Sequence, residues 1–238
     1  MKWKLIKISL PFVFILLLFE RRAQAQCRIV KMVSDSGKTL QFTYDTAGRV
    51  SKITETGGRI ACFDYANNIV VATETLRDSI VYKRIITLAA DGMMINLFEE
   101  SYPDGSPQWS YTSYSYHGKE LTGTTTITSK QATPSQTSIL WSNGNFISEQ
   151  TTDAPAANLF TYYTDQAMQP GDFWHINLLA TLGMGDRLYR NKNLLKSIQT
   201  ENGTVLLSYQ YDTEGKISSM TKTTDNSAII WQYEYECK

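Results

Sequence analysis

Short apolar or alternating runs of about five to nine residues follow one another from residue 28 to about residue 160, separated by residues typical of turns. Leu40, Phe42 and Tyr44 alternate with polar residues, and the segment 229–237 alternates in the same way. Because successive side chains of a strand point to opposite faces, such runs predict strands with one face in a core and one in water. The turn signals between them predict that each strand folds back antiparallel to the one before it.

One segment, residues 170–185, departs from this alternation. Asp172 is suited to cap the N-terminus of a helix over residues 173–182, and Gly183 is suited to end it in the left-handed conformation. The helix is apolar on most faces, which is typical of a buried helix. After it, strand-like runs resume and continue to the end of the chain.

The number of runs predicts the fold class. About 14–16 strands cannot form one flat sheet, because the twist between strands accumulates until the sheet curls, closes or splits. We therefore predict an all-β fold: a long antiparallel meander of about 14–16 strands, curled into an open or closed barrel-like sheet with one short core or plug helix. The Thr- and Ser-rich segment 123–138 is expected to be a polar strand that runs into an exposed loop around Pro134.

The first 25 residues have the pattern of a signal peptide. Lysines at the N-terminus precede the apolar run 10–19, and Ala23-Gln24-Ala25 forms a small-x-small cleavage site. We expect an exported protein of the periplasm, the cell surface or the extracellular space, with residues 1–25 as signal peptide and 26–238 as one antiparallel β domain. No membrane span is expected after cleavage, since the apolar run is shorter than the about 20 residues of a membrane helix. A transmembrane barrel is disfavoured because charges such as Arg49, Lys52 and Glu55 occupy both strand faces.

The net charge and the cysteines limit the possible partners and disulfide pairings. The full chain holds 23 basic and 23 acidic residues; without residues 1–25, which carry five basic residues and one acid, the net charge is −4. Such a chain has no basic block to neutralise phosphates, so no nucleic-acid partner is expected. Cys27, Cys62 and Cys237 leave three possible disulfide pairings, and the absence of any disulfide also stays open. A bridge from Cys27 to Cys237 is the favoured pairing, since it would tie the two ends of the mature chain together.

One pattern occurs twice, as FTYDTAGRVSKITET at 42–56 and YQYDTEGKISSMTKT at 209–223. In each copy an Asp, Asp45 or Asp212, stands where a turn begins and can accept hydrogen bonds from backbone N–H groups. A Gly three residues later, Gly48 or Gly215, fits the left-handed position of a bulged turn. We therefore interpret the repeat as a structural β-hairpin.

This Tyr-x-Tyr-Asp-x-x-Gly-Arg/Lys pattern resembles the YD repeats of Rhs-type surface proteins. Together with GDRLYRNKNLLKSI at 185–198 and the closing WQYEYEC, the two hairpins make most of the mature chain resemble a Bacteroidetes family of secreted or lipoprotein-like domains of unknown function with a porin-like β fold. The resemblance implies a β-sheet fold and implies no catalytic residues. Gln24-Ala25-Gln26 ahead of Cys27 departs from the lipid-attachment pattern of such proteins.

Signs of catalysis are weak. The two histidines, His117 and His175, lie in a predicted turn and in the predicted helix, and no catalytic or nucleotide-binding motif is present. Glu99 and Glu100 are adjacent and point to opposite faces of a strand, and the acids of the turns are explained by turn formation. We therefore expect no enzyme activity, no cofactor and no metal site.

Aromatic residues are the more suggestive feature, because Tyr and Trp can stack on a sugar or a peptide. Four of them follow closely and form the candidate binding strip: Trp109, Tyr111, Tyr114 and Tyr116. The same residues would also suit a sheet core. The sequence thus favours a non-enzymatic envelope or surface module, binding or structural, of unknown ligand, with a glycan or another envelope protein as the open partner classes. The alternative is a glycan-binding accessory protein or glycoside hydrolase of a carbohydrate-uptake system.

Overall fold

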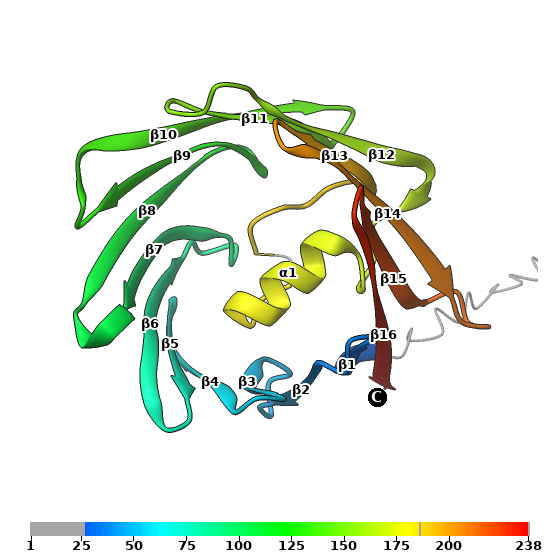
Figure 1. Ribbon diagram of the computed structural model, residues 1–238, viewed down its shortest axis with the longest axis horizontal. Coiled ribbons are helices and arrows are strands. Elements are labelled where there is room, and N and C mark those ends of the chain that lie inside the picture. Colours follow the sequence, from blue (N-terminus) through cyan, green and yellow to red (C-terminus); the bar gives the residue numbers. More distant parts are fainter. Residues whose placement is uncertain (1–26, 186, 238) are drawn as a thin grey trace, which may run out of the picture.

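The computed structural model describes residues 27–185 and 187–237, which form a closed barrel of antiparallel strands around one α-helix (Figure 1). The signal peptide expected at residues 1–25 lies outside the described residues. The sixteen strands are β1 (Cys27–Ser34), β2 (Thr39–Tyr44), β3 (Val50–Glu55), β4 (Arg59–Ala66), β5 (Ile69–Leu76), β6 (Ser79–Leu88), β7 (Met94–Ser101), β8 (Gln108–His117), β9 (Glu120–Thr128), β10 (Gln131–Ser142), β11 (Asn145–Thr151), β12 (Asn158–Ala167), β13 (Asn193–Thr200), β14 (Gly203–Tyr211), β15 (Ile217–Thr224) and β16 (Ser227–Cys237). A short 3₁₀ helix, η1 (Pro103–Gly105), precedes β8, and helix α1 (Phe173–Leu182) lies between β12 and β13.

Each strand pairs with the strand before it in the sequence, and β1 closes the barrel by pairing with β16. The closing register places Cys27 opposite Cys237 and Ser34 opposite Trp231. The predicted antiparallel meander, with about 14–16 strands and a plug helix, is therefore confirmed, and of the open and closed forms the closed one is observed. Closure removes the free sheet edges that would otherwise pair with other chains.

The prediction of an exposed loop around Pro134 is wrong. Residues 131–142 form β10, which pairs with β9 after a tight turn. The register between the two strands shifts from Gln131 to Ser135, so Pro134 lies in the irregular stretch. A bulge is where a strand tolerates a residue that lacks a backbone N–H donor, which is why the Pro did not break the strand.

Helix α1 lies inside the barrel and completes its core (Figure 1). Asp172 accepts a hydrogen bond from the backbone N–H of His175 at 2.6 Å, and Gly183 ends the helix with φ 68°. These are the cap residues that the sequence predicts. The helix buries Ile176, Leu179 and other apolar side chains against the strands.

Tyrosines secure one end of the barrel, called here the disulfide end, where Cys27, Cys237 and the turn at 45–49 lie. Each odd-numbered strand forms a hairpin with the even-numbered strand that follows it. In seven of these eight hairpins, an aromatic side chain of the even strand donates a hydrogen bond to a backbone carbonyl near the start of the odd strand. The donors are Tyr44, Tyr65, Tyr116, Trp141, Tyr162, Tyr209 and Tyr235. Register shifts at several of these strand ends interrupt the ladder of backbone hydrogen bonds, and each such bond satisfies a carbonyl there.

The two repeated hairpins have the geometry that their sequence pattern predicts. Asp45 Oδ1 accepts from the backbone N–H groups of Ala47 and Arg49, and Asp212 does the same in the second copy. Their aromatic positions differ, however. Tyr44 lies inside the barrel, whereas Tyr211, the equivalent residue, is 41% exposed and donates to the Gln166 side chain. The repeat predicts that Tyr211 lines the core as Tyr44 does, and this prediction is wrong. The register shifts at the same place in both hairpins, so the strand pairing does not distinguish them; the Tyr44 hydroxyl donates to the backbone of β1, whereas that of Tyr211 donates to the Gln166 side chain of β12.

Replacing Gly48 or Gly215 with Val is expected to lower the free energy of unfolding by more than about 1 kcal/mol, because φ is +78° and +81° at these positions and a β-branched side chain is strained there. No atom lies within 4 Å of the added Cβ, so the whole effect arises from backbone strain. Urea unfolding of each variant measures it. Gly48→Asn is the control and should lower the free energy of unfolding much less, since Asn adopts this conformation readily. An unchanged midpoint for both Val variants would contradict the turn assignment.

Candidate functional site

Helix α1 crosses the lumen and separates two cavities. His175, Leu179 and Gly183, on one side of the helix, line a cavity of about 710 Å³ at the disulfide end. Asn177 and Thr181, on another side, line a cavity of about 450 Å³ toward the opposite end. Both volumes fall in the range of small-molecule sites. The candidate functional site is therefore the lumen on either side of the helix.

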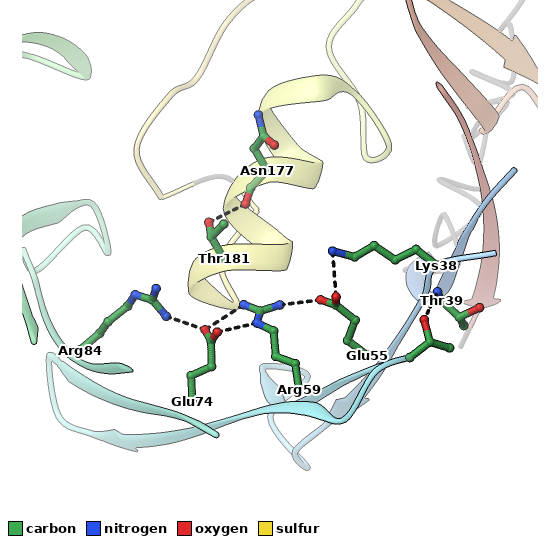
Figure 2. A network of polar contacts seen from close by, with 9 residues as sticks. Lys38, Thr39, Glu55, Arg59, Glu74, Arg84, Asn177 and Thr181 are labelled. Carbon is green, nitrogen blue, oxygen red and sulfur yellow. Dashed lines mark hydrogen bonds and ion pairs between the residues drawn. The ribbon is translucent and has the colours of Figure 1, made fainter. Parts of the chain in front are cut away.

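A row of alternating charges lines the end of the barrel opposite the disulfide. We call it the charge ladder, and each member comes from a successive strand or its adjoining turn. Its members are Lys38, Glu55, Arg59, Glu74, Arg84 and Glu99. Figure 2 shows the ladder from Arg84 to Lys38, beside the helix surface that carries Asn177 and Thr181. This end of the lumen, called here the ladder end, is thus strongly polar.

Glu74 is the centre of the charge ladder. Its carboxylate accepts two hydrogen bonds from Arg59, at 2.6 and 2.8 Å, and one from Arg84 at 3.0 Å. Burial by itself raises the pKa of Glu74, but the hydrogen bonds and charges of the two arginines outweigh it and hold the pKa below its usual value. A nearly buried carboxylate held between two guanidinium groups stays ionised and fixes the positions of both.

The ladder end continues past Glu99 as a wall of hydroxyl groups. Thr112 contacts Thr126 and Thr137 contacts Thr151, each pair at 3.0 Å between hydroxyl oxygens. Two further cavities, of about 540 and 390 Å³, lie along this rim and share the residues Ser101 and Gln108. Charged and hydroxylated surface therefore extends around much of this mouth.

The cavity at the disulfide end is lined by arginines stacked on tyrosines. The Arg28 guanidinium lies 4.2 Å from the ring centre of Tyr44, and Arg49 lies 4.2 Å from that of Tyr65. Arg28 pairs with Glu236 across the closing strands, and Arg49 pairs with the turn residue Asp45. Burial raises the pKa of Tyr44 and of Tyr65 to about 12, so both hydroxyls keep the proton that they donate to backbone carbonyls.

Asp172, which begins the helix, is fully buried. Burial raises the pKa of Asp172 to about 7, although hydrogen bonds from the backbone N–H groups of His175 and Trp174 oppose the rise. The pKa of Asp172 in the folded state lies above its unfolded value of 3.8. The carboxyl group therefore stabilises the folded state most below pH 3.8. That contribution declines as the pH rises from 3.8 to about 7.

Asp172→Asn is therefore expected to stabilise the protein at pH 8 relative to the wild type, while leaving stability at pH 4 nearly unchanged. The amide oxygen of Asn still caps the helix, and Asn has no charge to bury. Urea unfolding at both pH values measures the difference. Asp153→Asn, in an exposed turn, is the control and should change neither value. An equal effect of Asp172→Asn at pH 4 and pH 8 would show that the buried charge does not affect stability.

The barrel divides the predicted aromatic strip between its two surfaces. Trp109 and Tyr111 are on the outside, 41% and 38% exposed, and Tyr111 donates to the outward side chain of Asn96. Tyr114 and Tyr116 point inward and pack against the core. The two pairs therefore lie on opposite sides of the barrel wall, and a ligand on one side contacts only one pair. Ligand binding by either pair stays a prediction.

The favoured disulfide is present, with Cys27 and Cys237 joined at 2.05 Å, and Cys62 is free and exposed on the outer surface. The turn residues Asp45, Gly48, Asp212 and Gly215 occupy the positions expected for them. Sequence reasoning missed the charge ladder. The spacing of Glu55 and Arg59 across one turn was a local signal for it.

The Glu74 carboxylate differs from the acid of a general acid–base pair. Acid catalysis near neutral pH requires a carboxyl group with a raised pKa, and the pKa of Glu74 is lowered. Among residues 27–185 and 187–237, no group of three or more metal-binding side chains is found, and no helix has the length and apolar character needed to cross a membrane. The arrangement is suited to recognise charge and hydrogen-bonding groups.

These features define a closed sixteen-stranded β-barrel with an internal helix. No protein-family profile and no curated protein matches the sequence. A porin-like protein from Bacteroides uniformis has a TM-score of 0.63 at 17% identity, and the match covers 87% of this chain and 98% of that chain. A porin-like protein from Bacteroides vulgatus covers the same shares, at a TM-score of 0.43 and 12% identity.

The structure of TcdB2-TccC3-TEV matches with a TM-score of 0.36 and 17% identity over 85% of this chain and 10% of that chain. The likeness to the B. uniformis protein, at 17% identity, shows the fold. The predicted porin-like β fold is therefore confirmed. The resemblance of the hairpins to YD repeats stays a prediction.

Proposed function

We propose that this protein is an exported, non-enzymatic envelope barrel that binds a ligand in its lumen. The observation that carries the proposal is helix α1, which lies across the lumen with a cavity of small-molecule size on either side. A helix in this position leaves concave, chemically distinct compartments within reach of the two barrel mouths. Such compartments are the usual location of ligand sites in β-barrels.

Binding is favoured over passage of solutes because the helix is firmly held. Its N-terminus is capped by Asp172 and its C-terminus by Gly183. Trp174 packs in a cluster with Phe146, Phe160 and other aromatic rings at centroid distances of about 4–6 Å. Opening a continuous channel would require all of these contacts to be broken.

Two observations support export. The signal-peptide pattern of residues 1–25 is one, and the Cys27–Cys237 disulfide, which fits an oxidising compartment, is the other. The outer surface favours a water-exposed barrel, because Lys31 lies opposite Glu234 and Lys83 lies opposite Glu100 on outward positions. A lipid-facing wall needs an unbroken apolar band instead.

The alternative, a glycan-binding accessory protein or glycoside hydrolase, predicts a different chemistry. A hydrolase needs two carboxyl groups about 5–9.5 Å apart, one of them protonated. Glu74 is held between Arg59 and Arg84, whose hydrogen bonds and charges keep its pKa below the usual value and favour its ionised form. We therefore favour ligand binding over glycoside hydrolysis as the function. Hydrolysis of members of a glycan panel by the purified chain would favour the hydrolase instead.

A ligand panel tests the proposal. The mature chain is screened by thermal unfolding against sugars, carboxylates, amines and short peptides, and at least one class is expected to raise the melting temperature. Asn177→Trp, which fills the cavity beside the helix, should abolish binding at the ladder end, whereas Gln41→Trp, at an exposed position of β2, should not. A ligand that Asn177→Trp still binds belongs to the disulfide-end cavity.

Two results would overturn the proposal. One is a panel in which no compound shifts the melting temperature. The other is rapid swelling of liposomes by the reconstituted protein in sugar solutions, since free permeation requires an open lumen.

A further inference from the structure

The cavity of about 450 Å³ at the ladder end has two chemically different walls. It lies between helix α1 and an arc of strands that includes β2, β3, β15 and β16, so it joins both sides of the barrel closure. Helix residues Phe173, Ala180 and Thr181 line the side nearest the barrel centre. This cavity is the part of the proposed ligand site whose lining residues suggest a particular ligand class.

One wall is apolar and faces the lumen. Met220 pairs with Trp231 and Lys222 pairs with Ile229, so these four side chains lie on the same inner face. Ile229 is 39% exposed although it points into the barrel. Leu40 and Met220 are buried behind this face, so its accessible apolar surface comes from Ile229 and the half-buried Trp231, and such surface in a concave site is what the body of an apolar ligand requires.

The other wall is charged, and its basic and acidic residues pair with one another, so the surplus positive charge of the cavity comes from Lys222 on the first wall. Lys38 pairs with Glu55 at 2.9 Å, and Arg59 pairs with Glu55 and with the ladder residue Glu74. Lys222 also lines the cavity, and no described acidic residue forms an ion pair with it. Even with Glu74 included, the cavity has three basic side chains against two acidic ones.

We propose that this cavity binds an amphipathic anion, a carboxylate with an aliphatic or aromatic body. The body lies against Trp231, Ile229 and Phe173, and the carboxylate pairs with Lys222, beside Lys38. An opposite charge placed next to an unpaired cation inside a concave, partly apolar site is favoured. This inference rests on the proposed function, since it assigns a ligand class to one of the two lumen cavities.

The surplus positive charge excludes the cationic counterpart of such a ligand. An alkylammonium ion would bring a second unpaired cation next to Lys222, and like charges repel strongly where solvent screening is reduced. A neutral sugar would leave Lys222 unpaired. A carboxylate with an apolar body is therefore the ligand class that complements both the apolar surface of the cavity and the charge of Lys222.

Isothermal titration with three eight-carbon probes tests the proposal. Octanoate is expected to bind, 1-octanol to bind at least about tenfold more weakly, and octylammonium not to bind measurably. Lys222→Met should weaken octanoate at least about tenfold and leave 1-octanol unchanged, while Lys222→Arg retains octanoate binding. Lys52→Met, at an exposed position of β3, is the matched control and should change nothing.

Equal affinities for octanoate and octylammonium would overturn the inference, as would an unchanged affinity of Lys222→Met for octanoate. The two proposals fail differently. If octanoate does not bind but another compound does, and Asn177→Trp abolishes that binding, the anion assignment fails and lumen binding stands. If no compound of the panel binds, both fail.

Discussion

The double substitution Cys27→Ser/Cys237→Ser is expected to lower the free energy of unfolding by about 3–5 kcal/mol. The bridge joins residues 210 positions apart, so it constrains the whole segment 27–237 in the unfolded state. In the folded state it lies at the seam where β1 pairs with β16, and its loss lets the two terminal strands fray. Equilibrium urea unfolding gives the difference, and the melting temperature should fall by roughly 10 °C.

Cys62→Ser is the matched control, because that thiol is free and exposed. It should shift stability by less than about 0.5 kcal/mol. Treating the wild type with a reductant before unfolding should reproduce the effect of the double substitution. Equal stability of the oxidised wild type and the double variant would show that strand pairing alone holds the barrel closed.

Phe146→Ala is expected to lower the free energy of unfolding by about 3–5 kcal/mol. Phe146 is fully buried at the start of β11, and its ring lies 4.4 Å from that of Phe160 and 5.7 Å from that of Trp174 on the helix. It stacks on Tyr189 at 5.4 Å. Removing the ring leaves a cavity between helix and wall, so urea unfolding followed by near-UV circular dichroism should show both lower stability and loosened aromatic packing.

Leu140→Ala, on the preceding strand, is the matched control. Leu140 is 61% exposed on the outer surface, and its truncation should change stability by less than about 0.5 kcal/mol. A loss below about 1 kcal/mol for Phe146→Ala would mean that the helix is not held by this cluster. In that case, a movable helix and passage of solutes through the lumen would have to be reconsidered.

Much of the fold was predictable because its signals are local. Alternation such as Leu40, Phe42 and Tyr44 depends only on the two-residue period of a strand, and turn chemistry at Asp45 and Gly48 depends on a few neighbouring residues. The helix was predictable from Asp172 and Gly183 for the same reason. The two misjudged positions depend on other strands: Pro134 lies at a register shift between β9 and β10, and the Tyr211 hydroxyl donates to Gln166 of β12.

The lumen site was not predictable, because its residues come together only through the register of many strands. Glu74 meets Arg59 and Arg84 from neighbouring strands, at sequence separations of 15 and 10. Lys222 and Lys38 line one cavity although nearly the whole chain separates them. The candidate aromatic strip failed to form one surface for a local reason: Tyr111 and Tyr114 are three residues apart, so the alternation of β8 places Trp109 and Tyr111 outside and Tyr114 and Tyr116 inside.

Periodicity and turn residues act over a few positions, and they suffice to specify a chain of short antiparallel strands with one capped apolar helix. Closure of the sheet, division of the lumen by the helix and the pairing of charges there arise only when distant strands come together. Closure depends on pairing between the first and last strands, and such long-range register leaves no local pattern. The repeated Tyr-Asp hairpins therefore specify how the wall turns, and the assembled wall creates the site.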